Sequence, residues 1–203
     1  MKNFESTINK TYSFSDCDKC EKDCCSGLRG TIFSQLILED FSEVYRNFPI
    51  LFIFGDLGYL KPVVLLTNGE SFCNYLKDGK CSIYEKRPSV CRVYPLSPNL
   101  DDLIYIDTSC PAISENSDEY DVLVENSAVT NTLDFDRLND YSTKYVETFR
   151  EFDKFNKKED FSLAITIRNM QFFKYNKDTQ DKYMTMHQES LVHLKDSYFK
   201  HLS

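Results

Sequence analysis

The chain has 203 residues, a net charge of −8 and 41% hydrophobic residues, which fits one globular domain that buries its own core. No apolar run approaches the ~20 residues of a membrane span, and residues 1–16 contain no apolar stretch typical of a signal peptide. The acidic balance argues against binding to a phosphate backbone. We therefore expect a cytoplasmic protein that binds neither nucleic acid nor membrane, and the eight cysteines are its anomaly.

Residues 1–120 contain all eight cysteines, all six glycines and all six prolines, so the secondary structure elements there must be short. The predicted elements, in chain order, are a helix near 38–48, strands at 50–54 and 60–66, a turn at 77–80 around Asp78-Gly79, and a strand at 103–107. We expect this part to be irregular and organised by a metal.

Residues 121–203 contain neither Gly nor Pro, and their apolar residues recur with the period of a helix. One predicted helix follows Leu138, Tyr141, Tyr145, Phe149 and Phe152. A second follows Tyr183, His187, Leu191, Leu194, Tyr198 and Leu202, and His187 on its apolar stripe reads as a core residue rather than a ligand. Residues 161–175 read as a third helix, with Asp160 as its N-cap. The predicted fold is α+β and mostly helical, with residues 1–120 packed on a helical bundle of 121–203 as one unit.

Four cysteines lie within nine residues, at Cys17, Cys20, Cys24 and Cys25. Adjacent and i+3 cysteines have poor disulfide geometry, whereas thiolates from one tight loop converge readily on a soft metal. Two other interpretations stay open: cysteine also serves as a small buried hydrophobe, and Cys17-x2-Cys20 could be a redox pair, although it lacks a strand-then-helix context. The polar surroundings of this group favour a metal. Cys73, Cys81, Cys91 and Cys110 would supply ligands from farther along the chain.

The spacing favours an iron–sulfur cluster over zinc. Structural zinc usually takes two ligand pairs from two knuckles, and only Cys17/Cys20 resembles a knuckle. Closely spaced cysteines plus a remote one, and the dipeptide Cys110-Pro111, are closer to iron–sulfur ligand runs. No histidine lies between Cys17 and Cys110, which indicates an all-sulfur set of ligands. The eight thiols could fill one site or two.

A second cysteine segment reads C-S-I-Y-E-K-R-P-S-V-C-R-V-Y-P over residues 81–95. Together with the first group, residues 14–111 resemble the YkgJ-type cysteine-cluster family of zinc- or iron-chelating domains, whose boxes are CxxCxxCC and C-S-I-Y-x-x-R-P-x-x-C-R-x-Y-P. The first box departs by one residue, because three rather than two residues separate Cys20 from Cys24. In that respect it is similar to the relatives that include flagellin lysine N-methylase.

The resemblance implies that the seven cysteines of the two boxes bind metal, with Arg87 and Arg92 beside them. It supports a ligand role for Cys110 less strongly. Guanidinium groups there would offset the negative charge of the thiolates, although each could equally form an ordinary surface ion pair. The methylase resemblance implies an alternative function, a cluster-dependent lysine methyltransferase that uses S-adenosylmethionine on a protein substrate. No glycine-rich nucleotide loop supports that alternative, and the sequence identifies no catalytic residue.

Overall fold

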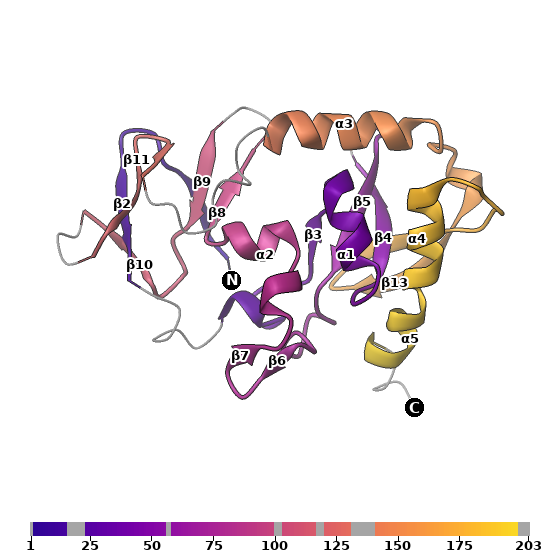
Figure 1. Cartoon of the computed structure of the whole chain (residues 1–203), viewed down its shortest axis with the longest axis horizontal. Coiled ribbons are helices and arrows are strands. Elements are labelled where there is room, and N and C mark those ends of the chain that lie inside the picture. Colours follow the sequence, from indigo (N-terminus) through magenta and orange to yellow (C-terminus); the bar gives the residue numbers. More distant parts are fainter. Residues whose placement is uncertain are drawn as a thin grey trace.

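A computed structural model of the chain describes residues 2–15, 23–55, 58–99, 103–116, 120–130 and 141–198. The described residues form fourteen strands and five α-helices in an elongated molecule, shown in Figure 1. The prediction of a mostly helical chain with a C-terminal helical bundle is therefore wrong. None of the described helices has the length and apolar character needed to cross a membrane.

The largest sheet has five strands in the order β13-β14-β4-β5-β3, and every neighbouring pair is antiparallel. Its strands are β3 (Phe33–Gln35), β4 (Ile50–Phe54), β5 (Leu60–Leu65), β13 (Phe161–Ile167) and β14 (Met170–Tyr175). The strand predicted at 50–54 is confirmed, and the one predicted at 60–66 ends one residue earlier. Both are nearly continuous apolar runs, as expected for strands that are buried on both faces.

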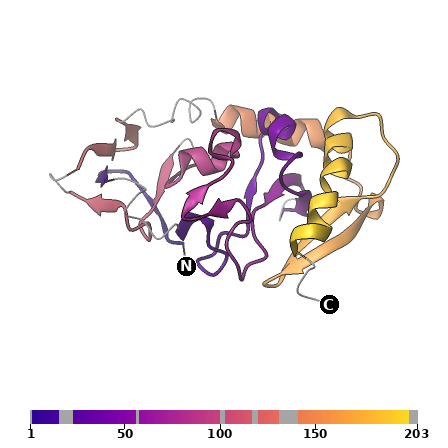
Figure 2. The ribbon, with the colours of Figure 1, turned by 60° about the horizontal axis from the view of Figure 1, so that its bottom comes forward.

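Successive residues of β4 enter different cores, because side chains alternate across a strand. Ile50 and Phe52 are fully buried in a core that also contains residues of the helices α1 (Phe41–Val44), α3 (Tyr141–Asp153) and α4 (Lys182–Ser190). Leu51 is fully buried in a second core with Leu194 and Tyr198 of α5 (Val192–Tyr198). The sheet thus separates two cores, and α4 and α5 follow one another beside it (Figures 1 and 2).

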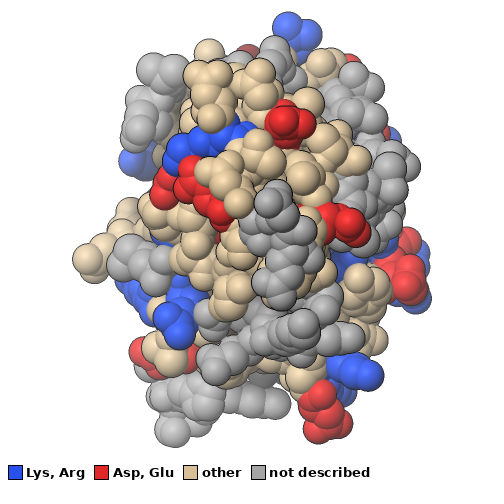
Figure 3. Space-filling model, turned by 90° about the vertical axis from the view of Figure 1, so that its left-hand side faces the viewer, with Lys and Arg blue, Asp and Glu red and all other residues tan. Residues whose placement is uncertain are grey.

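Two smaller sheets form the other end of the molecule. One has the order β1-β9-β8 and the other β10-β2-β11-β12. The strands are β1 (Phe4–Ser6), β2 (Thr11–Phe14), β8 (Leu96–Pro98), β9 (Ile104–Asp107), β10 (Ile113–Glu115), β11 (Val122–Glu125) and β12 (Ala128–Val129). They enclose a third core that includes Tyr12, Leu96, Ile106 and Val124. On the face of this end seen in Figure 3, basic and acidic side chains of the described residues are interspersed.

Residues 161–175 form a β-hairpin instead of the predicted third helix, and Asp160 ends a short 3-10 helix (Lys158–Asp160) instead of capping an α-helix. Arg168 and Asn169 connect β13 to β14, and both have positive φ angles, 47° and 68°. Such a two-residue turn matches the twist of a hairpin, and asparagine adopts it readily. The run Ile165-Thr166-Ile167 also favours a strand, because β-branched side chains are stiff in helices.

The other predicted C-terminal helices are confirmed as α3 and as the pair α4 and α5, while Leu138 and Leu202 lie outside the described residues. His187 is a core residue as predicted: it is fully buried, accepts a hydrogen bond from the backbone N–H of Tyr175 at 3.0 Å, and lies 2.6 Å from the carbonyl oxygen of Ile50. Strands on both sides of residue 120 share sheets, since β14 pairs with β4 and β11 pairs with β2.

Candidate metal centre

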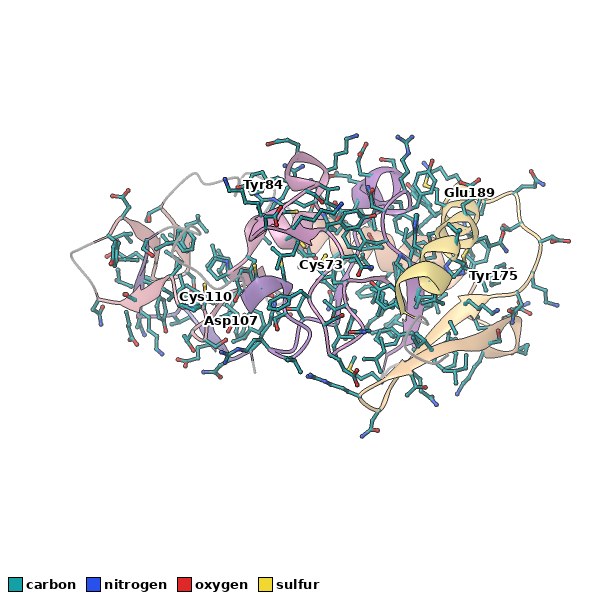
Figure 4. The ribbon with its side chains drawn as sticks, turned by 90° about the horizontal axis from the view of Figure 1, so that it is seen from below. Cys73, Tyr84, Asp107, Cys110, Tyr175 and Glu189 are labelled. Carbon is teal, nitrogen blue, oxygen red and sulfur yellow. The ribbon has the colours of Figure 1, made fainter. Side chains whose placement is uncertain are left out.

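A cavity of about 750 Å³ brings most of the described cysteines together. Its wall is built from β1, β3, β8, the first turn of α3, the hairpin of β6 (Leu76–Lys77) and β7 (Lys80–Cys81), and α2 (Ser89–Val93). The cysteines that line it are Cys24, Cys25, Cys73, Cys81 and Cys91. Cys17 and Cys20 lie outside the described residues. In Figure 4, Cys73 lies near the middle of the molecule, whereas Cys110 lies toward the end formed by the smaller sheets.

Backbone hydrogen bonds join the two cysteine segments directly. Cys24 and Cys25 lie on a 3-10 helix (Asp23–Cys25), and the backbone N–H of Cys73 donates to the carbonyl of Cys25 at 2.8 Å. The next residues continue this contact, with a β-bridge between Ser26 and Phe72 and a 2.9 Å hydrogen bond from Gly27 to Ser71. Residues almost fifty positions apart are therefore held in a fixed register.

Gly27 permits this close approach. A Cβ atom at this position would lie 2.8 Å from the backbone of both Gly69 and Ser71 and 2.6 Å from Thr67 Oγ1. Backbone atoms at such a distance cannot move without disturbing the register of the two segments. Glycine is thus required here for space.

Cys81 and Cys91 reach the cavity from two further elements. Cys81 pairs with Leu76 across the β6–β7 hairpin, whose turn at Asp78-Gly79 was predicted from the sequence and has both residues at positive φ. Cys91 lies on α2, whose first residue, Ser89, donates its hydroxyl to Asp40 Oδ1 at 2.6 Å. Asp40 and Ser89 are 7% and 2% exposed, so this charge-assisted hydrogen bond is shielded from water.

The cysteines lie close enough to influence one another's ionisation. The pKa of Cys73 is raised to about 11, chiefly by burial and to a smaller extent by the neighbouring Cys81 and Cys24, while a hydrogen bond from the backbone N–H of Tyr75 opposes the shift. Burial also raises the pKa of Cys91 strongly, with additional contributions from Cys73, Cys24 and Cys81 and an opposing one from Lys2. Both thiols therefore carry their protons at neutral pH, and a metal must displace those protons to bind.

The described thiols are not arranged around a single ion. Tetrahedral zinc with 2.3 Å bonds to sulfur holds its ligands about 3.8 Å apart. Cys24 Sγ and Cys25 Sγ are 3.9 Å apart, which matches that spacing and excludes a disulfide between them. Within the described ranges, however, no three His, Cys, Asp or Glu side chains lie close enough to hold one metal ion. Five of the described cysteines instead share the wall of one cavity.

Residues 16–111 match the model of the CxxCxxCC family, whose description is "putative zinc- or iron-chelating domain". These residues belong to that family. The family predicted from the two cysteine boxes is thereby confirmed, and metal binding with it. No curated protein and no solved structure matches the chain. The described part of the CxxCxxCC domain contains the cavity cysteines, the β6–β7 hairpin and α2. Residues outside this domain complete the cavity wall.

The two arginines of the second cysteine box have different surroundings. Arg87 lines the cavity, and its guanidinium lies 3.7 Å from the centroid of the Tyr84 ring. Arg92 does not line the cavity; its Nε donates to the carbonyl of Arg87 at 3.2 Å, and its Nη2 donates to the carbonyl of Glu85. Arg92 therefore holds the backbone turn that carries Arg87.

Cys110 is not among the described cysteines that line the cavity. It is 5% exposed, and its backbone N–H donates to the carbonyl of Asp107 at the end of β9. Asp107 is fully buried and accepts hydrogen bonds from Tyr94 Oη at 2.9 Å and from Ser109 Oγ at 2.6 Å. Burial, followed by Cys110 and Asp107, raises the pKa of Tyr94. Because Tyr94 lines the cavity, Asp107 connects the turn that carries Cys110 to the cavity wall. Metal binding by Cys110 stays a prediction.

Several residues of the cavity were not predicted from the sequence. Thr31, Tyr141 and Tyr145 line the cavity from loops and helices whose proximity depends on the fold. Asp40, which holds α2 beside the cavity, precedes Cys91 by about fifty residues. A usable signal was present for Ile83, Tyr84, Pro88 and Tyr94, because they stand at fixed positions of the second cysteine box. The remaining wall residues have no local pattern that indicates a site.

Proposed function

We propose that residues 16–111 bind an iron–sulfur cluster in the cysteine-lined cavity. The observation that carries this proposal is that five thiols line one cavity, although no three of the described ligand-type side chains converge on a single point. A cluster spans the distance between separated thiolates, whereas a lone ion needs them about 3.8 Å apart. The spread of the cysteines therefore favours a cluster over zinc.

The donor set fits such a cluster. Four cysteine thiolates are the usual ligands of iron–sulfur centres, and Cys24, Cys73, Cys81 and Cys91 are the described thiols that influence one another most directly. Cys25, Cys73, Cys81 and Cys91 are free thiols, as binding requires. A bound cluster supplies electron transfer or a site for ligand activation, and Arg87 would balance part of its negative charge. Thiols in this state persist in a reducing compartment, so we place the protein in the cytoplasm.

Anaerobic purification followed by analysis of iron, zinc and acid-labile sulfide tests this proposal. We expect iron and sulfide in equal amounts and a broad visible absorption that dithionite bleaches. A colourless protein with stoichiometric zinc and no sulfide would overturn the iron–sulfur assignment and leave the domain as a zinc site.

Two cysteine variants localise the metal. Cys91→Ser removes a thiol of the cavity, and Cys110→Ser removes a buried thiol of the same domain that does not line it. We expect the first to lose most of the bound metal and the second to retain it, with thermal unfolding measured for both so that folding defects are recognised. Equal metal loss in the two variants, with both folded, would contradict the proposed position. Methyl transfer from S-adenosylmethionine stays a prediction from the resemblance.

A further inference from the structure

The cavity is larger than a cluster requires. It has a volume of about 750 Å³. The eight inorganic atoms of a cubane cluster fill at most about 240 Å³ if each takes about 30 Å³, the share of a water molecule in the liquid. Roughly 500 Å³ then stays available, which lies within the range of small-molecule sites.

The described residues of the wall carry positive charge only. Lys2, Lys80 and Arg87 line the cavity, and none of its described lining residues is acidic, in a chain whose net charge is −8. Two of these cations lie against aromatic rings: Arg87 is 3.7 Å from the centroid of Tyr84, and Lys2 is 4.4 Å from that of Tyr94. Cations held beside flat rings suit an anionic group attached to a planar body.

A pair of tyrosines forms a further flat surface. Tyr141 and Tyr145 occupy the first turns of α3 with their rings stacked at 6.1 Å and an interplanar angle of 17°. Both line the cavity and are less than 10% exposed. Tyr84, in contrast, is 53% exposed, and Lys80 is exposed as well, so these two residues mark the mouth of the cavity while α3 closes its interior. Figure 4 shows Tyr84 toward the outside and Cys73 deeper.

Two buried hydroxyls of the wall lack hydrogen-bond partners among the described residues. They are Thr31 Oγ1 and Tyr145 Oη, on residues that are 5% and 4% exposed. A buried polar group without a partner costs about 1–3 kcal/mol. Polar atoms of a molecule that enters the cavity, water or a ligand, could satisfy both hydroxyls.

We propose that this cavity binds a small organic anion with a planar body beside the cysteines. Its carboxylate or similar group would contact Arg87 and Lys80 at the mouth, and its planar body would lie among Tyr84, Tyr141 and Tyr145. This site goes beyond metal binding and does not depend on which metal the cysteines hold.

Three matched probes separate the requirements for charge and for planarity. Isothermal titration of the purified, metal-loaded protein would use 2-naphthoate, the neutral and equally planar 2-naphthamide, and the non-planar anion cyclohexanecarboxylate. We expect 2-naphthoate to bind at least tenfold more tightly than either of the others. Equal affinities for the three, or no binding of 2-naphthoate, would overturn the proposal.

Three variants locate the anion. Arg87→Gln should weaken 2-naphthoate at least fivefold and leave 2-naphthamide unchanged, and Lys80→Gln should weaken 2-naphthoate about threefold. Arg46→Gln is the control, because Arg46 also lies over a tyrosine ring, at 5.5 Å from the centroid of Tyr45, but does not line the cavity. If both cavity variants bind like Arg46→Gln, the proposed anion site is wrong. Metal analysis of the same samples distinguishes this failure from failure of the metal site.

Discussion

Replacing Gly27 with alanine tests whether the contact between the two cysteine segments positions the metal ligands. The new Cβ would meet backbone atoms of Gly69 and Ser71 at 2.8 Å, so the segments must move apart. Such overpacking costs about 1–3 kcal/mol. The hydrogen bonds from Gly27 to Ser71 and from Cys73 to Cys25 would weaken too, at about 0.5–1.5 kcal/mol each. We expect a total loss of roughly 3 kcal/mol, equivalent to about 6–12 °C in Tm.

The displacement should also impair metal binding, because Cys24 and Cys25 would no longer face Cys73 in the native register. We expect at least tenfold weaker binding, measured by competition with a chelator. Gly58→Ala is the control: Gly58 has a φ of 78° and no atom within 4 Å of an added Cβ. That variant should lose about 1–2 kcal/mol from backbone strain and keep its metal. If Gly27→Ala binds metal as tightly as Gly58→Ala, the contact does not position the ligands.

Three further predictions concern buried groups. Burial lowers the pKa of His187 to about 4, so the free energy of unfolding should fall by about 3 kcal/mol as the pH drops from 6.5 to 4. In urea titrations at several pH values, His187→Gln should remove this pH dependence. An unchanged pH dependence in the variant would contradict the prediction. The pKa of Cys73 is raised from 9.0 to about 11, so the free energy of unfolding of the metal-free protein should fall by about 2 kcal/mol as the pH rises between these values. If the Cys73→Ala variant shows the same fall, the prediction is wrong. Asp40→Asn should lower the free energy of unfolding by about 1–2 kcal/mol, because it weakens the hydrogen bond from Ser89. It should also lower the pKa of Tyr141, which is raised by burial and next by Asp40. Ultraviolet titration measures this pKa, and the exposed Asp78→Asn is the control.

The apolar runs of the central sheet were predictable, and its hairpin was not. Strand β4 matches its prediction because a five-residue apolar run next to proline has few alternatives. In residues 161–175 the aromatic residues recur at spacings that also fit a helix, and no Gly or Pro marks the turn. The deciding signal was local: Arg168-Asn169 accepts positive φ angles, and β-branched residues precede it.

The candidate site was predictable only as far as its cysteines. The two boxes indicated a shared metal site, and the fold places five of their thiols on one cavity. The aromatic wall comes from β3 and α3, more than 100 residues apart, and depends on tertiary packing. Hydrophobic periodicity identified Tyr141 and Tyr145 as core residues of a helix, but it carries no information about a cavity beside that helix.

The position of α2 explains why the cavity forms where it does. Cys91 packs against the core of the central sheet, and Val93, two residues later, is buried in the core of the two smaller sheets. One short helix therefore belongs to both ends of the molecule, and Asp40 fixes its first residue. A five-residue helix has little stability of its own, so its geometry depends on these anchors. Metal bound at Cys91 would add another, and because binding free energy becomes folding free energy, it would stabilise the junction between the two cores as well as the cysteine segments.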